Sequence, residues 1–151
     1  MRLLLHIILV LVIRGSVSAQ CDSKKLSDDC VKTFPKEFIF SKTRFIEINS
    51  PADQKNANYS VILSKGTTYV VTVYEPEKNK NQGRLVVSLY DNKDRLIISS
   101  YSLASKKYYS KITFTCNATG TYYLTYLFDG DGYKGCGASA FGFKQKVTAQ
   151  R

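Results

Sequence analysis

The chain has 151 residues, a formal net charge of +10 and 13% aromatic residues, with 11 tyrosines and no tryptophan. Its one histidine, His6, lies in the N-terminal apolar stretch, so histidine-dependent catalytic triads and histidine zinc sites are excluded from the rest of the chain. The basic residues are scattered and do not form a cluster, which favours a soluble basic surface over a nucleic-acid site.

Residues 1–19, MRLLLHIILVLVIRGSVSA, are predicted to form a cleaved secretory signal peptide. Arg2 supplies the positive charge, and residues 3–13 form the apolar run. Val17 and Ala19 match the small positions before a cleavage site. The run is shorter than the roughly 20 apolar residues that span a bilayer, so a signal anchor is the less favoured alternative. No second long apolar segment follows, and we expect no transmembrane segment in the mature chain.

Residues 20–33 are predicted to form a polar N-terminal arm. Beyond the signal peptide the chain has four cysteines, Cys21, Cys30, Cys116 and Cys136. In an exported protein this number predicts two disulfides. The simplest of the possible pairings closes two local loops, with Cys21 bonded to Cys30 and Cys116 bonded to Cys136. Each closure would stabilise the fold by roughly 2.5–3 kcal/mol in the chain-entropy model.

The cysteines also allow two other interpretations. Acylation of Cys21, as in bacterial lipoproteins, is disfavoured because Gln20 stands where such signals have a small residue. A zinc site made of all four cysteines is disfavoured because their spacing contains no C-x₂-C pair. We therefore expect no metal and no other cofactor.

Residues 34–146 are predicted to form a single domain whose dominant pattern is the two-residue alternation of β-strands. About eight short strands separated by turn residues predict an all-β fold, an antiparallel β-sandwich or jelly roll strapped by disulfides. Residues 147–151 are expected to be a flexible tail. The expected strands, in chain order, are EFIF (37–40), RFIEI (44–48), YSVIL (59–63), TTYVVTVY (67–74), RLVVSLYD (84–91), RLIISSY (95–101), KITFTC (111–116), TYYLTYLF (121–128) and ASAFGF (138–143).

The segment FDGDGYKG, residues 128–135, has the oxygen ligands that a calcium loop needs, in Asp129 and Asp131. A calcium loop of the EF-hand type also needs a closing glutamate, and none follows. Asp-Gly pairs are a strong signal for a hairpin turn, because glycine accepts positive φ angles without steric cost. We therefore interpret the segment as a turn.

Three stretches taken together resemble the bacterial pre-peptidase C-terminal domain, a small jelly-roll-like β-sandwich found on secreted hydrolases. They are LSKGTTYVVTV (63–73), GRLVVSLYDNKDRLIISS (83–100) and KITFTCNATGTYYLTYL (111–127). The resemblance covers roughly residues 59–143. It implies a β-sandwich that serves as a non-catalytic accessory in secretion, stability or substrate attachment, and it carries over no binding residues.

A candidate interaction surface lies in the segment SSYSLASKKYYSK, residues 99–111. Its aromatic and basic members are Tyr101, Lys106, Lys107, Tyr108 and Tyr109. Tyrosines that only cover the surface of the sandwich are the favoured interpretation, because the ring buries apolar area while the hydroxyl stays wet. A protein interface comes next, and a surface for glycans or other anionic polymers comes third.

Two sequons, Asn58-Tyr59-Ser60 and Asn117-Ala118-Thr119, could be glycosylated in a eukaryotic host. The composition and the domain resemblance favour a bacterial source, in which the sequons would be inert. A secreted eukaryotic glycoprotein remains the minor alternative.

Catalysis without histidine would require a carboxylate pair such as glycosidases use. The acidic residues of the chain lie mostly in turns or beside lysines, so we expect no catalytic residues. The sequence thus predicts an exported β-sandwich that binds a protein partner in a bacterial cell envelope or surface assembly, located in the periplasm, at the outer membrane or outside the cell. A carbohydrate- or anionic-polymer-binding module is the alternative.

Overall fold

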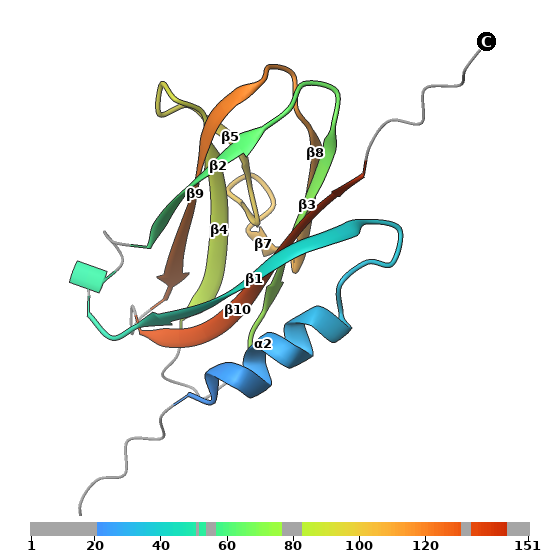
Figure 1. Cartoon of the computed structure of the whole chain (residues 1–151). Coiled ribbons are helices and arrows are strands. Elements are labelled where there is room, and N and C mark those ends of the chain that lie inside the picture. Colours follow the sequence, from blue (N-terminus) through green and yellow to red (C-terminus); the bar gives the residue numbers. More distant parts are fainter. Residues whose placement is uncertain (1–20, 51, 54–56, 77–82, 131–133, 145–151) are drawn as a thin grey trace, which may run out of the picture.

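A computed structural model describes residues 21–50, 52–53, 57–76, 83–130 and 134–144 (Figure 1). The predicted signal peptide and the predicted tail lie outside these residues. Among the described residues, no helix is both long and apolar enough to cross a membrane. The described elements, in chain order, are α2 (Ser23–Lys32), β1 (Ile39–Ile48), β2 (Asn58–Leu63), β3 (Thr68–Tyr74), β4 (Arg84–Tyr90), β5 (Leu96–Ser99), β6 (Tyr101–Ser102), β7 (Lys107–Tyr108), β8 (Lys111–Thr115), β9 (Gly120–Asp129) and β10 (Gly135–Lys144).

The strands form two four-stranded antiparallel sheets and one small hairpin, which confirms the predicted β-sandwich. Sheet A has the strand order β1-β10-β3-β8, sheet B has the order β2-β9-β4-β5, and β6 pairs with β7. Most successive strands alternate between the two sheets, as in a jelly roll. The two predicted segments 37–40 and 44–48 merge into the single long strand β1.

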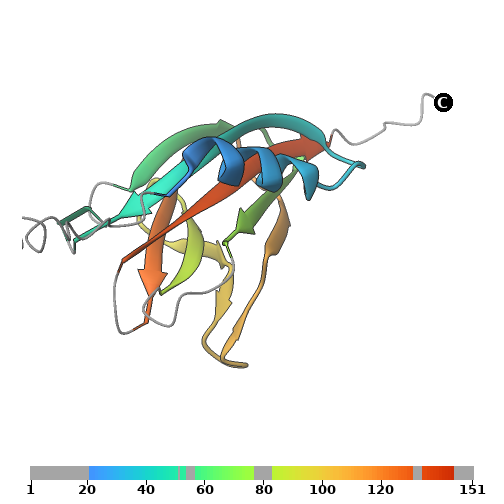
Figure 2. The ribbon, with the colours of Figure 1, turned by 90° about the horizontal axis from the view of Figure 1, so that it is seen from below.

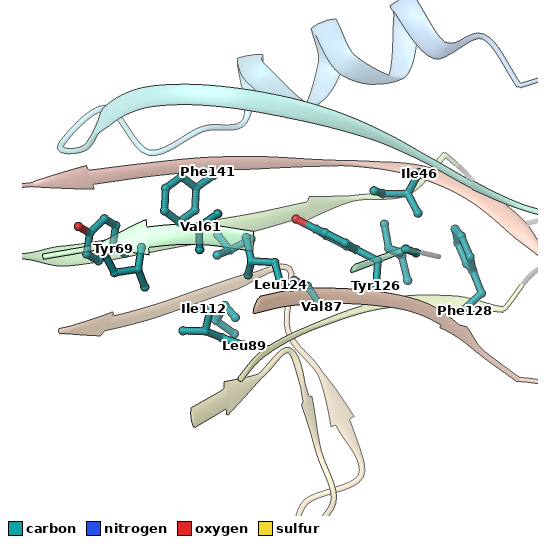
Figure 3. Packing of buried hydrophobic residues seen from close by; sticks show 14 of the residues in the cluster. Ile46, Val61, Tyr69, Val87, Leu89, Ile112, Leu124, Tyr126, Phe128 and Phe141 are labelled. Atoms are coloured by element: carbon teal, nitrogen blue, oxygen red, sulfur yellow. The ribbon is translucent and has the colours of Figure 1, made fainter. Parts of the chain in front are cut away.

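The core lies between the sheets and follows the predicted alternation. On β9 the side chains of Leu124, Tyr126 and Phe128 are almost fully buried, and Figure 3 shows them pointing into the space between the sheets. The alternation of the KITFTC segment predicts that Ile112, Phe114 and Cys116 point inward, since alternate residues of a strand share a face. Ile112 and Cys116 are buried, and Phe114 is partly buried against the same core. Burying each large apolar side chain contributes about 1.5–3 kcal/mol to stability.

Helix α2 covers the outer face of sheet A, where the sequence predicted only a polar arm (Figure 2). Asp22 caps the helix by accepting a 2.9 Å hydrogen bond from the backbone N–H of Lys25. Leu26 and Cys30, which are four residues apart and so share one helix face, are buried in a cluster with alanines of β10. The small alanine side chains let the helix approach the sheet closely.

The disulfide joins Cys21 to Cys136, two residues separated by 115 positions with their Cα atoms 6.3 Å apart. The predicted pairing is therefore wrong, and Cys30 and Cys116 are buried free thiols. Cys30 lies about two helical turns beyond Cys21, too far for a bond because a disulfide needs Cα atoms about 4.4–6.8 Å apart. The bond ties the start of α2 to the start of β10 and thus fixes the arm to sheet A.

Cys116 cannot reach Cys136 because the two lie at opposite ends of sheet A. Cys116 follows β8, beside the end of β3 whose first residue, Thr68, pairs with Lys144. Lys144 is the last residue of the 10-residue strand β10, and Cys136 is near its first. A strand of this length spans roughly 30 Å. The sulfurs are therefore separated by almost the whole sheet.

Arg44 of β1 crosses from sheet A to sheet B at the seam between β1 and β2. Its guanidinium carbon lies 3.7 Å from the centre of the Tyr59 ring on β2, a cation–π contact. The Nε atom of Arg44 is buried and has no hydrogen-bond partner among the described residues. Burial, with a smaller contribution from the charge of Arg44 on the same strand, holds the pKa of Lys42 below its ordinary value.

Candidate functional site

The predicted interaction surface falls on the β6–β7 hairpin, which Figure 2 shows projecting beyond the body of the sandwich. Tyr101 pairs with Tyr108, and Ser102 pairs with Lys107. Lys106 has a positive φ of 55° in the turn between the strands. The hairpin thus brings the predicted residues together at one place, although the role of these residues stays a prediction.

Two of the five predicted residues brace the base of this hairpin. The Tyr108 hydroxyl donates a 2.6 Å hydrogen bond to Oδ2 of Asp129 on β9. The Tyr108 ring centre lies 4.6 Å from that of Tyr101 and 4.7 Å from the guanidinium carbon of Arg84. The hydrogen bond to the Asp129 carboxylate, assisted by burial and by the carboxylate charge, raises the pKa of Tyr108 to about 12.

The brace continues into the sheets through an ion pair. Arg84 Nε donates a 2.9 Å hydrogen bond to Oε2 of Glu75, just past the end of β3. The other oxygen of Glu75 accepts a hydrogen bond from the backbone N–H of Leu85. Arg84 and Asp129 are register partners on the neighbouring strands β4 and β9. The two contacts of Tyr108, its hydrogen bond to Asp129 and its ring contact with Arg84, therefore involve the same cross-strand pair.

The remaining predicted residues are exposed. Lys106 and Lys107 lie at the solvent-facing end of the hairpin, and the Tyr109 side chain is 47% exposed. The backbone N–H of Tyr109 donates a 2.7 Å hydrogen bond to the carbonyl of Ser100, which fixes the chain where it leaves the hairpin. Leu103, which the sequence interpretation missed, is 73% exposed in the turn. The one sequence signal for Leu103 was its position as a large apolar residue among serine, alanine and lysine residues in the expected turn.

A second feature of the outer face of sheet B is a shallow pocket of about 480 Å³. Tyr90 on β4 and Tyr123 on β9 are direct register partners. They face away from the core because their chain neighbours, Leu89 and Leu124, are buried in it. The residues that line the pocket are Asn58, Tyr90, Asp94, Tyr123 and Thr125.

The sequence interpretation assigned no role to this pocket. Tyr90 and Tyr123 lie in strands far apart in the sequence, and only the sheet register brings them together. Asn58 and Thr125, a second register pair, provide an amide and a hydroxyl beside the two rings. The one sequence signal was that both tyrosines occupy outward positions of their alternating strands.

The turn after β4 holds the pocket residue Asp94 in place. Asp91 accepts hydrogen bonds from the backbone N–H groups of Lys93 at 2.8 Å and Arg95 at 3.0 Å. The Arg95 guanidinium also pairs with Asp91 at 2.6 Å. These contacts, led by the Arg95 backbone N–H, hold the pKa of Asp91 below its ordinary value. Asp94 itself has a positive φ of 57° and an exposed side chain.

Metal ligands do not gather in the described part of the chain, where no group of three His, Cys, Asp or Glu side chains is placed to hold an ion. Asp129 of the calcium-loop interpretation is bonded to Tyr108. Its partner in that interpretation, Asp131, lies outside the described residues. Gly130, with a φ of 129°, has the positive angle that favours glycine in a turn.

The two free cysteines, Cys30 and Cys116, are both buried. Burial raises the pKa of the Cys30 thiol, which keeps it neutral under helix α2. The Cys116 thiol donates a hydrogen bond to the carbonyl of Ala118 at 3.0 Å. Of the two sequon asparagines, Asn117 lies in an exposed turn and Asn58 is the first residue of β2.

No protein-family model matches the chain, and no curated protein matches its sequence. Among solved structures it is similar to PliG from Aeromonas hydrophila, a periplasmic lysozyme inhibitor of g-type lysozyme. The two share 10% sequence identity with a TM-score of 0.46, over 74% of this chain and 91% of that chain. At this level the similarity identifies neither a family nor a function.

Proposed function

We propose that this chain is an exported, non-catalytic domain that binds a protein partner through the β6–β7 hairpin. The observation that carries the proposal is the contrast between the two ends of the hairpin. Its base is fixed to the sheets by Tyr108 and Arg84, while its turn presents Leu103 to solvent at 73% exposure. A rigid element with an exposed apolar tip is what a docking loop requires.

Rigidity matters because a flexible loop loses conformational entropy when it is ordered at an interface, at about 0.5–1.5 kcal/mol per immobilised side chain. The brace at the hairpin base has already fixed the Tyr101 and Tyr108 rings in the free protein. Binding therefore has less entropy to overcome. This is the physical reason for placing the partner at this hairpin and not at a mobile loop.

The chemistry of the tip favours a partner with an apolar pocket and an acidic rim. Leu103 supplies the apolar anchor, and a few well-packed residues near the centre of an interface carry most of its binding energy. Lys106 and Lys107 beside it supply positive charge, which steers an acidic partner and improves specificity more than affinity. An accessory or structural subunit of a bacterial cell-envelope or surface assembly fits this description.

Export and the lack of catalysis are part of the same proposal. The predicted signal peptide and the Cys21–Cys136 disulfide both suit an oxidising compartment, such as the periplasm or the cell exterior. The absence of histidine after residue 6 removes the commonest general acid–base group. The resemblance to pre-peptidase C-terminal domains supports an accessory role, and it stays a prediction.

Site-specific photo-crosslinking in the cells that export the protein tests the proposal. A benzophenone amino acid replaces Leu103 in one strain and Ile62 in another; Ile62 is a matched control because it is 80% exposed but lies on β2. We expect one discrete adduct from position 103, lost on adding Lys106→Glu and Lys107→Glu, and none of that mass from position 62. Adducts of the same mass from both positions, or none from position 103, would contradict the proposal.

A further inference from the structure

The pocket on the outer face of sheet B is a second candidate for binding, independent of the hairpin. Helix α2 covers the outer face of sheet A, but the rings of Tyr90 and Tyr123 lie in a pocket that no described element fills. Tyr123 is 39% exposed. A volume of about 480 Å³ is in the size range of small-ligand sites, which runs from about 300 to 1,000 Å³.

The pocket chemistry limits the ligand class. Among the described residues, its lining combines two aromatic rings with an amide, a hydroxyl and a carboxylate and includes no cationic side chain. The one charged side chain among the described lining residues is the Asp94 carboxylate, which suits phosphate or sulfate poorly, although the chain has 22 basic and only 12 acidic residues. The ligand must bring apolar area for the rings and hydrogen-bond donors for the carboxylate.

A sugar ring provides both of these. One face of a pyranose is lined by C–H groups that pack on an aromatic ring, while its hydroxyls donate and accept hydrogen bonds around the edge. A carboxylate accepts from hydroxyl groups at two oxygens, and an amide both donates and accepts. Asp94, in the turn between β4 and β5, lines the pocket beside the tyrosine pair and offers a carboxylate to these hydroxyls.

The position of Asp94 is fixed before any ligand arrives. The backbone N–H of Asp94 donates to the carbonyl of Asp91 at 3.2 Å, and the Asp91 side chain organises the same turn through Lys93 and Arg95. Its positive φ is one that aspartate and asparagine tolerate better than most residues. The backbone of Asp94 is therefore held by this turn, and its side chain lines the pocket.

We propose that the pocket formed by Tyr90, Tyr123, Asp94, Asn58 and Thr125 binds a neutral sugar unit of a glycan. The ring packs on the tyrosines, and its hydroxyls donate hydrogen bonds to the Asp94 carboxylate. This site differs from the glycan surface that was the third interpretation of the hairpin segment, where the Tyr108 hydroxyl is occupied by Asp129. It does not depend on the proposed protein partner, and it would make the domain a bridge between a glycan and a protein.

Titration of the full disulfide-bonded protein tests the site, with ligand-observed NMR as the readout. The probes are the disaccharides cellobiose, chitobiose and mannobiose. Nα-acetyl-lysine amide, which keeps its side-chain ammonium, is the cationic probe, and sodium sulfate is the anionic one. We expect binding of at least one disaccharide that changes little with salt and weakens roughly tenfold in Tyr123→Ala and in Asp94→Asn. Tyr109→Ala, which removes an exposed tyrosine of the hairpin, should leave it unchanged.

Asp94→Asn keeps the shape of the side chain and a residue that accepts positive φ, so it separates loss of binding from loss of folding. No binding of any of the three disaccharides would overturn the proposal. Binding that survives both Tyr123→Ala and Asp94→Asn would overturn it as well. A third result would assign the pocket to a cationic ligand instead. In that result no sugar binds, and Nα-acetyl-lysine amide binds in a salt-sensitive way that is lost in Asp94→Asn.

Discussion

The Tyr108 hydroxyl and the Asp129 carboxylate, 2.6 Å apart, connect the β6–β7 hairpin to the last residue of β9. Asp129 pairs in register with Arg84, and Arg84 in turn lies near the Tyr108 ring and binds Glu75. One tyrosine thus holds a projecting hairpin against a cross-strand pair of opposite charges. The hairpin is fixed at its base by polar contacts, and its apolar residue is left at the tip.

Replacing Tyr108 with phenylalanine should destabilise the protein by about 1 kcal/mol. The change removes a hydrogen bond to a carboxylate, and the value is below the roughly 1.5–3 kcal/mol typical of bonds to charged groups because both groups are partly exposed. Urea unfolding followed by circular dichroism measures the effect. Tyr109→Phe is the matched control and should stay within about 0.5 kcal/mol of the original protein. Equal effects of the two changes would show that Tyr108 does not brace the hairpin.

Stability should fall as the pH rises from about 10 to about 12. In the folded state the pKa of Tyr108 is raised to about 12 by the bond to Asp129, and that of Tyr126 is raised to about 12 by burial. In the unfolded chain both return to about 10. Between these values the unfolded state binds fewer protons than the folded state, so raising the pH favours unfolding. Below pH 10 both states keep the protons and the contribution is constant.

Lysines also titrate in this range, so the comparison must be made between variants. The free energy of unfolding of Tyr108→Phe should depend less steeply on pH between 10 and 12 than that of the original protein. Tyr109→Phe should keep the original slope. A Tyr108→Phe slope identical to that of the original protein would show that the Tyr108 pKa is not raised by folding.

Non-reducing peptide mapping should recover one cross-linked pair, containing Cys21 and Cys136. Cys30 and Cys116 should react with alkylating reagents only after unfolding, because both are buried. Cys21→Ser should lower stability by about 2–5 kcal/mol, since the bond closes a very long loop. Recovery of a Cys116–Cys136 peptide from folded protein would contradict the structure.

Leu26→Ala should cost about 2–3 kcal/mol, because Leu26 is buried where α2 packs on β10. Val31→Ala, on the exposed side of the same helix, should cost less than about 0.5 kcal/mol. Thermal unfolding of the two variants measures the difference. If both changes had the same small effect, helix α2 would not be packed against sheet A in solution.

The alternating strand pattern of the sequence was enough to predict the β-sandwich, but it did not predict helix α2, which covers sheet A. Alternation in KITFTC correctly placed Ile112 and Cys116 in the core, because strand periodicity is a local property. Helix α2 was missed because only Leu26 and Cys30 of its ten residues are buried hydrophobics. Two buried apolar positions in an otherwise polar segment are a weak periodic signal.

The disulfide and the pocket could not be predicted because both depend on which distant strands become neighbours. Cys21 meets Cys136 only because α2 lies along β10, the neighbour of β1 in sheet A. Tyr90 meets Tyr123 only through the register of β4 with β9. The hairpin residues were easier to find, since Tyr101 and Tyr108 are close in the sequence as well as in the fold.

The central claim is that the tip of the β6–β7 hairpin docks a protein partner, and a binding measurement on tip variants tests it most directly. With the partner identified by crosslinking at position 103, calorimetry would compare Leu103→Asp with Ile62→Asp, which places the same charge at an exposed apolar position on β2. We predict that Leu103→Asp weakens the affinity about 30-fold or more while Ile62→Asp leaves it unchanged. Equal affinities of the two variants would contradict the account.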